Sequence, residues 1–414
     1  MTGLVVRHLC CLLYPKALST GQKVAKVDRK GFYKDNHITN KTPMKEINLF
    51  REMLQQHLRW NAARVAFVSI FLVALIRVRT VNLAEIATGF SSEAKVESRY
   101  KRLQRFFREF EVDYESIALM VVKVMKIPEP WVISIDRTDW KFGKTVFNVL
   151  TLGVVHQGIA FPLIWLMLDK KGNSNTRERC ELWNRFLEIF ADRQIDFLTA
   201  DREFVGEEWF DYLLSDPCTR FRIRIRKNTL LDDGQKKLRA DVCFQDLQVG
   251  QSKVLSQPRL VWGHSLYIAA MRLEDGDLLV VATAHLPHTA IADYAMRWAI
   301  ETLFGCFKSR GFCLESTHLQ HSERLSKLIA LLTIALCWCF SSGLWLSVFK
   351  SLKPKKHGRL PKSIFRLGFD FLRDIVLNLH LHANSSAFFN SINFLSCTYP
   401  KAIKKHASRV FLWL

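Results

Sequence analysis

Residues 131–168 read WVISIDRTDWKFGKTVFNVLTLGVVHQGIAFPLIWLML, and here the helical spacing of the preceding segments gives way to strand-like runs. The stretch holds three apolar runs rich in β-branched and aromatic residues, separated by the short segments WKFGK and QG. Apolar runs of this length, divided by glycine-containing turns, predict an antiparallel meander of three strands.

The sequence that follows alternates between helical and strand-like patterns. We expect an amphipathic helix at 176–190, a strand at 195–201, a second helix at 207–214 and a strand at 220–227, where basic and apolar residues alternate. Three paired strands followed by a helix, a strand and further helices predict a mixed α/β domain.

The segment 230–288 differs in character, because it is rich in turns and short strand-like runs. A helix without Pro or Gly is expected to follow it at 291–304. We therefore predict a β-rich block inserted between the last strand of the α/β domain and one of its helices. The α/β domain then comprises residues 126–229 and 289–349.

Helical patterns fill residues 44–125, where we predict an all-helical, DNA-binding domain. The segment SRYKRLQRFFREF, residues 98–110, combines basic residues with three Phe residues. Such a helix suits contact with a DNA backbone, and a solvated face packed through its Phe residues is the alternative.

Both ends of the chain are basic and weakly patterned. We expect residues 1–43 to form a disordered extension and residues 350–414 to form a basic surface extension. Because Met44 directly precedes the first well-patterned helix, we hypothesise that translation starts there.

The chain carries 60 Lys and Arg residues against 39 Asp and Glu residues, a formal net charge of +21. A balance this basic favours a polyanionic partner, most often nucleic acid, with an anionic membrane surface as the alternative. Hydrophobic residues make up 49% of the chain, which excludes a disordered basic tail protein. The ten cysteines form no CxxC pair, so we expect free thiols in a reducing cytoplasm and no zinc site.

One apolar run, 328–349, has 22 residues without a charge and is long enough to cross a membrane. Its Thr, Ser, Gly and Cys residues and the charged helix before it favour a buried helix that closes the core of a large domain. A second run, 65–76, is too short to span a bilayer. We therefore expect no membrane association.

Three acidic residues are candidates for catalysis. Asp136 ends the run WVISID and Asp201 ends the run IDFLTAD, so both are expected at the rim of a sheet, and Glu301 lies on the helix that follows the insertion. Three carboxylates in a basic protein favour two Mg²⁺ ions, with Mn²⁺ as a substitute. Such a site would activate a water or a 3′-hydroxyl for attack on a phosphodiester.

The residues alone leave this trio open, because four other acids lie nearby in the sequence: Asp139, Asp196, Glu203 and Glu207. Asp139 is expected to point elsewhere than Asp136, and Asp196 begins its strand rather than ending it. Paired carboxylates also occur in glycosidases, but the basic pI near 9.7 and the missing aromatic cleft pattern disfavour that class.

Residues 294–308, YAMRWAIETLFGCFK, have two different faces when placed on a helix. An arc of about 100° holds an aromatic hydroxyl, an indole, two cations and one carboxylate: Tyr294, Trp298, Arg297, Lys308 and Glu301. The opposite side is apolar and is expected to be buried: Met296, Ile300, Leu303 and Phe307. A solvated outer face with an i, i+4 ion pair is the alternative, but Trp and Tyr are costly choices for such a face.

This helix has the form Y-x2-R-x3-E-x6-K, which resembles the YREK signature of bacterial insertion-sequence DDE transposases of the IS-four type. Asp136 in ISIDRTDW and Asp201 in TADREF match the first and second Asp blocks of that family. The order Asp, Asp, Glu agrees as well, as does a β-rich insertion before the Glu-bearing helix.

The resemblance implies an RNase H-like catalytic domain in which Asp136, Asp201 and Glu301 hold two Mg²⁺ ions. It implies cleavage at the ends of an insertion sequence and joining to target DNA. This cut-and-paste reaction often runs through a DNA hairpin, in a synaptic homodimer. The N-terminal helices would bind the terminal inverted repeats, and the protein would act on double-stranded DNA in the bacterial cytoplasm, at the nucleoid.

The resemblance also implies roles for four neighbours of the catalytic acids. Tyr294, Arg297 and Lys308 would hold phosphates near the cleaved end, and Trp298 would stack against a flipped base, a contact typically worth about 1–3 kcal/mol. The alternative function is a catalytically decayed copy that binds DNA as a repressor or inhibitor.

Overall fold

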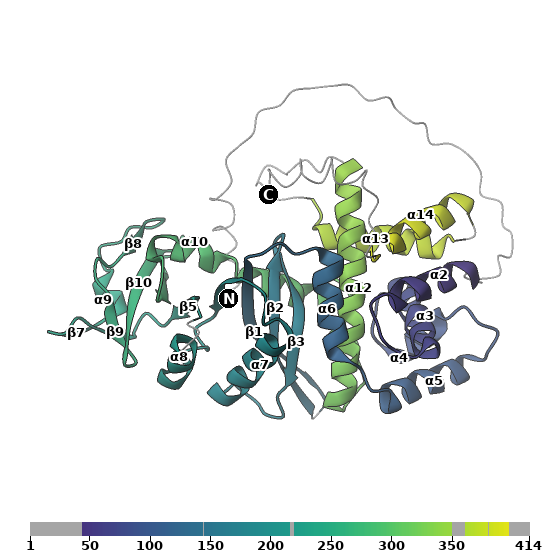
Figure 1. Cartoon of the computed structure of the whole chain (residues 1–414), viewed down its shortest axis with the longest axis horizontal. Coiled ribbons are helices and arrows are strands. Elements are labelled where there is room, and N and C mark those ends of the chain that lie inside the picture. The colour runs from purple at the N-terminus through teal and green to yellow at the C-terminus, as the bar shows by residue number, and fades with distance from the viewer. Residues whose placement is uncertain (1–43, 144, 216–218, 350–360, 380, 397–414) are drawn as a thin grey trace, which may run out of the picture.

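One sheet of eleven strands runs from the centre to the left-hand end of the molecule in Figure 1, a computed structural model. The structure describes residues 44–143, 145–215, 219–349, 361–379 and 381–396. The disordered extension expected over residues 1–43 lies outside the described residues, and the structure does not test a translation start at Met44.

The meander predicted at 131–168 is confirmed. It consists of β1 (Trp131–Phe142), β2 (Thr145–His156) and β3 (Ile159–Met167), each antiparallel to the next. The strands β2 and β3 are buried along most of their length, which explains why they read as continuous apolar runs rather than as alternating ones, whereas β1 is buried mainly in its first half.

Two further strands extend the sheet from β1 by parallel pairing. They are β4 (Ile195–Ala200), beside β1, and β5 (Phe221–Ile225), beside β4. Parallel neighbours need crossover connections, and these are supplied by α7 (Thr176–Ile189) and α8 (Glu207–Leu214). The predicted helix at 207–214 therefore matches α8, and the mixed α/β character of this part of the chain is confirmed.

The segment 230–288 is β-rich, as expected, and it joins the main sheet. Its elements are β6 (Leu230–Asp232), β7 (Lys237–Arg239), α9 (Ala240–Cys243), β8 (Ser252–Val254), β9 (Arg259–Val261), β10 (His264–Arg272) and β11 (Leu278–Thr283). β11 returns antiparallel to β5, with Val280 opposite Ile225, so the insertion continues the sheet edge that β5 leaves open.

The single helix expected at 291–304 is divided in two. A short 3-10 turn, η2 (Pro287–Thr289), leads into α10 (Ala290–Ala295), and α11 (Trp298–Phe307) follows after a turn at residues 296–297. A single straight helix across this break therefore predicts the wrong side chains to be buried. Tyr294, expected on the polar face, is 1% exposed, whereas Met296, expected in the core, is 44% exposed.

The right-hand part of Figure 1 is helical. The N-terminal segment forms α2 (Met44–Gln55), α3 (Ala62–Val78), α4 (Leu83–Gly89), α5 (Val96–Glu109) and α6 (Tyr114–Met125). Asn61, Asn82 and Asp113 accept backbone hydrogen bonds at the starts of three of these helices. Their buried side chains belong to the same hydrophobic core as the sheet, so this segment does not pack as a separate unit.

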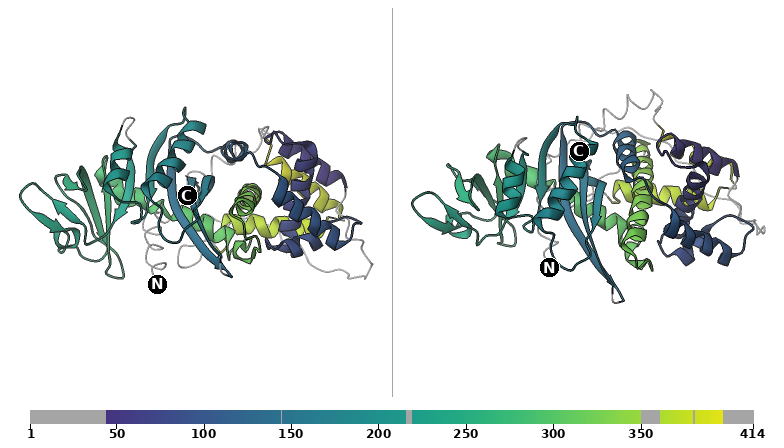
Figure 2. Two further views of the ribbon diagram at one scale, coloured as in Figure 1. Left: turned by 90° about the horizontal axis from the view of Figure 1, so that it is seen from below. Right: turned by 60° about the horizontal axis from the view of Figure 1, so that its bottom comes forward.

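The apolar run at 328–349 lies in α12 (Ser322–Phe349), which stands between the sheet and the helical part of the molecule (Figure 2). Among the described residues this is the one helix long and apolar enough to cross a membrane. Counting the bent pair α3 and α4 as one span would add a second candidate. In α12, 89% of the apolar window is buried inside the protein, as expected for a core helix. A short 3-10 turn, η3 (Leu314–Ser316), precedes it.

The prediction of a surface extension over 350–414 is wrong for its described part. Residues of this region form α13 (Ile364–Leu377) and α14 (His382–Asn393), which pack against α12, α3 and α2. The missed signal is a helical spacing of apolar residues that are now buried: Phe365, Phe369, Leu372, Ile375 and Val376. The helices α12 and α13 approach so closely that a Cβ at Gly368 would stand 1.8 Å from the Cys339 carbonyl oxygen.

Candidate active site

The parallel pairing of β1 and β4 ends at Ile135 and Ala200, and an aspartate follows each of them. Asp201 lies just past the end of β4, as predicted. Asp136 does not end its strand, because β1 continues to Phe142 and pairs there with β2 alone. The prediction was wrong on this point because the apolar run stops where β4 ends, not where β1 ends. Both aspartates therefore lie at the same rim.

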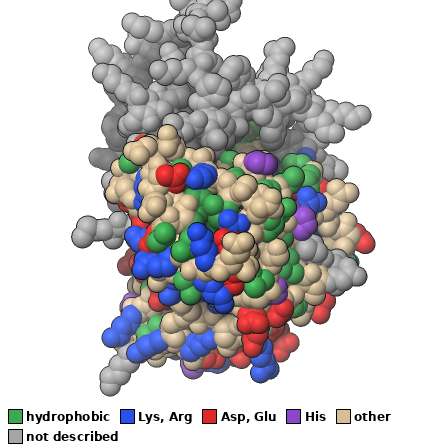
Figure 3. Space-filling view, turned by 90° about the vertical axis from the view of Figure 1, so that its left-hand side faces the viewer, with side chains coloured by type: hydrophobic (Ala, Val, Ile, Leu, Met, Phe, Trp, Pro, Cys, Tyr) green, Lys and Arg blue, Asp and Glu red, His purple; other side chains and the backbone are tan. Residues whose placement is uncertain are grey.

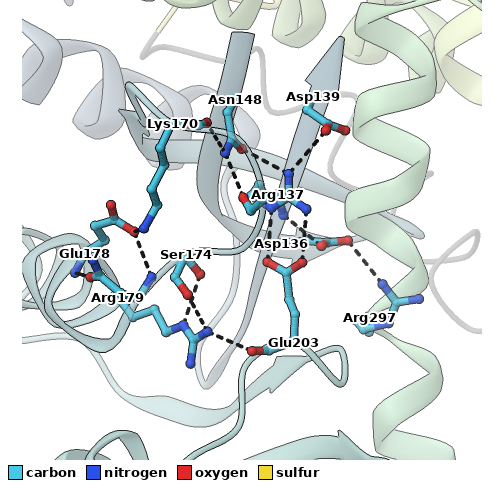
Figure 4. Close-up of polar contacts among 12 residues, drawn as sticks. Asp136, Arg137, Asp139, Asn148, Lys170, Ser174, Glu178, Arg179, Glu203 and Arg297 are labelled. Carbon is cyan, nitrogen blue, oxygen red and sulfur yellow. Dashed lines mark hydrogen bonds and ion pairs between the residues drawn. The ribbon is translucent and has the colours of Figure 1, made fainter. Parts of the chain in front are cut away.

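The third acid reaches this rim through Arg297, in the turn between α10 and α11. Its guanidinium donates to Asp136 Oδ2 at 3.2 Å and to Glu301 Oε1 at 2.5 Å. The Tyr294 hydroxyl donates to Asp201 Oδ1 at 3.2 Å, and Arg297 lies over the Tyr294 ring. The fold thus gathers Asp136, Asp201, Glu301, Tyr294 and Arg297 from two strands and the broken helix. Figure 4 shows Arg297 reaching Asp136.

Burial sets the charge state of the two aspartates. It raises the pKa of Asp136 to about 7, because the pull of Arg297 and of the Arg137 backbone N–H only partly offsets desolvation. Burial also raises the pKa of Asp201, but Arg297, the Arg202 backbone N–H and Arg224 outweigh it, and the net pKa is lowered. Burial lowers the pKa of Arg297 itself, and the surrounding acidic groups reverse this effect. The site therefore holds one readily ionised carboxylate, Asp201, and one whose ionisation is opposed by burial, Asp136.

The donor set fits a hard divalent cation, since Asp136, Asp201 and Glu301 offer only carboxylate oxygens. Among the described residues, however, no three acidic, His or Cys side chains already stand together as a metal site. Arg297 contacts one oxygen each of Asp136 and Glu301, so its guanidinium would compete with a bound ion for these carboxylates.

A second set of contacts fixes the strand around Asp136, and sequence patterns did not predict it. Arg137 donates to both carboxylate oxygens of Glu203 at 3.4 Å and to Asn148 Oδ1 at 3.1 Å (Figure 4). The Asn148 amide donates at 2.9 Å to the carbonyls of Lys170 and Gly172. Glu203, a competitor for the catalytic role by sequence, therefore serves here as a partner of Arg137.

The loop after Asp201 is held from α7. The buried Arg179 donates to the carbonyls of Glu203 at 2.7 Å and Val205 at 3.2 Å, and to the hydroxyl of Ser174 at 3.0 Å (Figure 4). These backbone contacts fix the direction in which the chain leaves Asp201. Nothing in the local pattern TRERCELW distinguishes Arg179 from a surface arginine, so sequence reasoning missed it.

The helix α10 is anchored by a buried ion pair. Arg222, on β5, donates to Asp293 Oδ2 at 2.9 Å and to Thr283 Oγ1 at 2.6 Å, and its side chain is 2% exposed. Because Asp293 directly precedes Tyr294, the pair fixes the start of the segment that carries Tyr294 and Arg297. Arg222 was expected on a polar strand face, and the helix α10 lies against that face.

The two remaining candidates lie elsewhere on the segment. Trp298 begins α11 and is half-buried. Lys308, at its end, donates to the Asp139 carbonyl at 3.0 Å, pairs with Glu315 at 3.0 Å and lies over the Trp140 ring. Lys308 thus contacts the far end of β1 rather than the three carboxylates.

The other competing acids have partners of their own. Asp139 is largely exposed and pairs with Arg137 at 3.5 Å, and Asp196 pairs with Arg220 at 3.7 Å. Glu207 begins α8 and lies against Gly263 of the insertion. None of these contacts includes Asp136, Asp201 or Glu301.

Comparison with known proteins identifies a family, and several solved structures are similar to this chain. The family model described as "Transposase DDE domain" matches residues 127–338. A cryo-EM structure of the piggyBac transposase synaptic complex with hairpin DNA is similar at a TM-score of 0.42 and 12% identity, over 86% of this chain and 84% of that chain. No curated protein matches. Because the family match covers more than half of the chain, the protein belongs to the Transposase DDE domain family and is a DDE transposase.

Proposed function

We propose that this enzyme is an insertion-sequence transposase of the IS-four type with a YREK segment. It binds terminal inverted repeats, cleaves the DNA at those ends and joins them to target DNA by cut-and-paste, through a hairpin intermediate. The observation that carries the proposal is that Arg297 contacts both Asp136 and Glu301, while Tyr294 beside it contacts Asp201. The three acids come from segments far apart in the chain.

In this proposal Asp136, Asp201 and Glu301 hold two Mg²⁺ ions, for which Mn²⁺ can substitute. When bound, ions of this kind lower the pKa of the attacking hydroxyl and stabilise the charge on the leaving oxygen. The Tyr294 hydroxyl orients Asp201 through its hydrogen bond, and because Tyr294 is buried this positioning role is favoured over direct contact with a phosphate.

Arg297 has two alternative partners in the proposed cycle. Before DNA binds, it neutralises Asp136 and Glu301. Once it is displaced from them, its planar guanidinium suits a phosphate near the cleaved end. Trp298, half-buried beside it, stacks on a flipped base, and Lys308 binds backbone phosphate at the other end of α11.

The proposed DNA path continues over the N-terminal helices, which bind the terminal inverted repeats. The exposed face of α5 supports this proposal because it presents four cations: Lys101, Arg102, Arg105 and Arg108. Two copies of the chain act together in the synaptic complex. The reaction takes place in the bacterial cytoplasm, at the nucleoid.

The decisive variant is Glu301→Ala. It should abolish Mg²⁺-dependent cleavage of terminal-repeat DNA while leaving binding of the same duplex unchanged within about twofold, since a ligand is lost and the phosphate contacts remain. Glu208→Gln, an exposed acid on α8, is the matched control and should cleave normally. Cleavage that survives in Glu301→Ala rules out the assigned trio. If the unmodified protein binds the duplex but does not cleave it in the presence of either Mg²⁺ or Mn²⁺, a repressor role replaces the proposed reaction.

A further inference from the structure

A pocket of about 330 Å³ opens beside Asp201, where the insertion meets the main sheet. Its walls include the residues that follow the carboxyl ends of β4 and β5, together with residues of the insertion. The lining is strongly basic and has one acid among its charged side chains: Arg202, Arg224, Arg226, Lys227, Arg239 and Asp277. In open α/β sheets, the crevice beyond the carboxyl ends of parallel strands is where ligands bind.

The pocket adjoins the catalytic rim directly. Arg202 is the residue after Asp201, and Arg224 lies 3.9 Å from Asp201 Oδ1. Arg224 also lies 3.6 Å from Asp277, so an acid on each side holds its guanidinium in place. A group bound in the pocket would therefore be separated from Asp201, a proposed metal ligand, by no more than the Arg224 side chain.

The positive charge in the pocket exceeds what its own acid can neutralise. Asp277 pairs with Lys227 at 2.8 Å and with Arg224, and Arg239 pairs with Asp241 at 2.5 Å. Arg202 and Arg226 are exposed and make no ion pair within the described part of the chain. In Figure 3, which views the insertion end of the molecule, Lys and Arg side chains gather over the left and lower part of the face, and Asp and Glu side chains gather at the lower right.

We propose that this pocket binds backbone phosphate of the DNA strand that runs away from the cleaved position, with Arg202 and Arg226 as its principal contacts. The inference rests on the proposed function and adds a role for the insertion. Arg239 and Asp277 come from the insertion, so the block between β5 and α10 supplies one wall of a groove whose other wall is the catalytic sheet. Guanidinium forks suit phosphate oxygens better than they suit an apolar ligand.

The first test measures the salt dependence of binding to a short fluorescein-labelled duplex of arbitrary sequence. The slope of log K against log salt is negative, and each lost phosphate contact reduces its magnitude by about 0.9. The double variant Arg202→Gln, Arg226→Gln should therefore reduce the magnitude of the slope by about 1 to 2. Lys236→Gln, an exposed cation in the turn between β6 and β7 that does not line the pocket, is the control and should leave the slope close to that of the wild type. Both arginines are exposed, so the circular dichroism and the melting temperature should not change. An unchanged slope in the double variant overturns the proposal.

The second test locates the contact. Duplexes of the element's terminal sequence carry one neutral methylphosphonate at successive positions around the cleaved end. The wild-type protein should lose affinity when the methylphosphonate stands at one or two positions. Arg226→Gln should not lose affinity there, because it already lacks the guanidinium that would contact that phosphate. If both proteins lose affinity equally at every position, the pocket does not hold phosphate. This readout does not need cleavage, so it can fail while Glu301→Ala still abolishes cleavage, and it can succeed if the assigned trio is wrong.

Discussion

The chemistry of the site at the scale of single residues depends on a competition for carboxylate oxygens. Arg297 contacts Asp136 and Glu301, two of the three proposed metal ligands. A guanidinium that holds these oxygens competes with a divalent ion for them. Without a metal, Arg297 therefore supplies the positive charge that neutralises Asp136 and Glu301.

Replacing Arg297 by Gln should strengthen Mn²⁺ binding in the absence of DNA. The variant no longer has to break a charge-assisted hydrogen bond before the ion binds, and a bond of about 1.5–3 kcal/mol corresponds to roughly tenfold or more in affinity. Isothermal titration with Mn²⁺ measures the change, and circular dichroism checks the fold. Arg220→Gln, which removes a surface pair with Asp196, is the control. Equal or weaker Mn²⁺ binding by the Arg297 variant would contradict the competition.

The raised pKa of Asp136 predicts a pH dependence for the same binding. Its carboxyl titrates near pH 7 in the folded protein, and an ion needs the ionised form. Mn²⁺ affinity should therefore fall by up to about tenfold per pH unit below pH 7 and level off above it. Asp136→Asn should remove this inflection. A flat profile in the wild type would show that burial does not raise the pKa of Asp136 into this range.

The free energy of unfolding of the metal-free protein should also depend on the Asp136 carboxyl, but it should fall as the pH rises. An acid whose pKa is higher in the folded than in the unfolded state stabilises the fold most below its unfolded pKa of about 3.9. That contribution is lost as pH rises to about 7.

At the scale of helices and strands, local composition predicts much of what is found. The meander, α7, β4 and α8 lie close to the positions that their apolar patterns indicate. The break between α10 and α11 was not predictable, because no Pro or Gly interrupts residues 291–304. The interruption instead places Arg297 against Asp136. The burial of Tyr294 and Arg222 was hidden for a related reason, since the strands and helices that cover them come from distant segments.

The close contact between α12 and α13 gives a prediction at this scale. A Cβ at Gly368 would overlap the Cys339 carbonyl oxygen, so Gly368→Ala must push the two helices apart. We expect a loss of about 1–3 kcal/mol in the free energy of unfolding, measured by urea denaturation. Gly305→Ala is the matched control within a helix, because its nearest neighbour is the flexible Arg310 side chain, and it should be neutral or slightly stabilising. Equal effects of the two changes would show that α13 packs less tightly than the structure indicates.

The whole molecule is organised around a core that crosses the predicted domain boundaries. Buried side chains of the N-terminal helices, the sheet, α12 and the C-terminal helices belong to one cluster. The helix α3 illustrates why, because it is apolar on all sides: its buried residues include Phe67, Phe71, Leu72 and Leu75. A helix of this kind must be covered all round by other elements, and α13 and α12 supply part of that cover. Composition alone could identify residues 44–125 as helical but could not show what covers them.

The segment 44–125 should therefore not fold when it is produced alone. Its helices would expose the faces that now contact α12, α13 and α14, so we expect an aggregated or molten fragment without a cooperative thermal transition by circular dichroism. Supplying residues 126–414 as a second chain should restore a soluble complex with a single transition close to that of the intact protein. Sequence reasoning instead predicted a DNA-binding domain with its own boundaries. A fragment that melts cooperatively and binds terminal-repeat duplex on its own would establish that domain and would contradict the shared core.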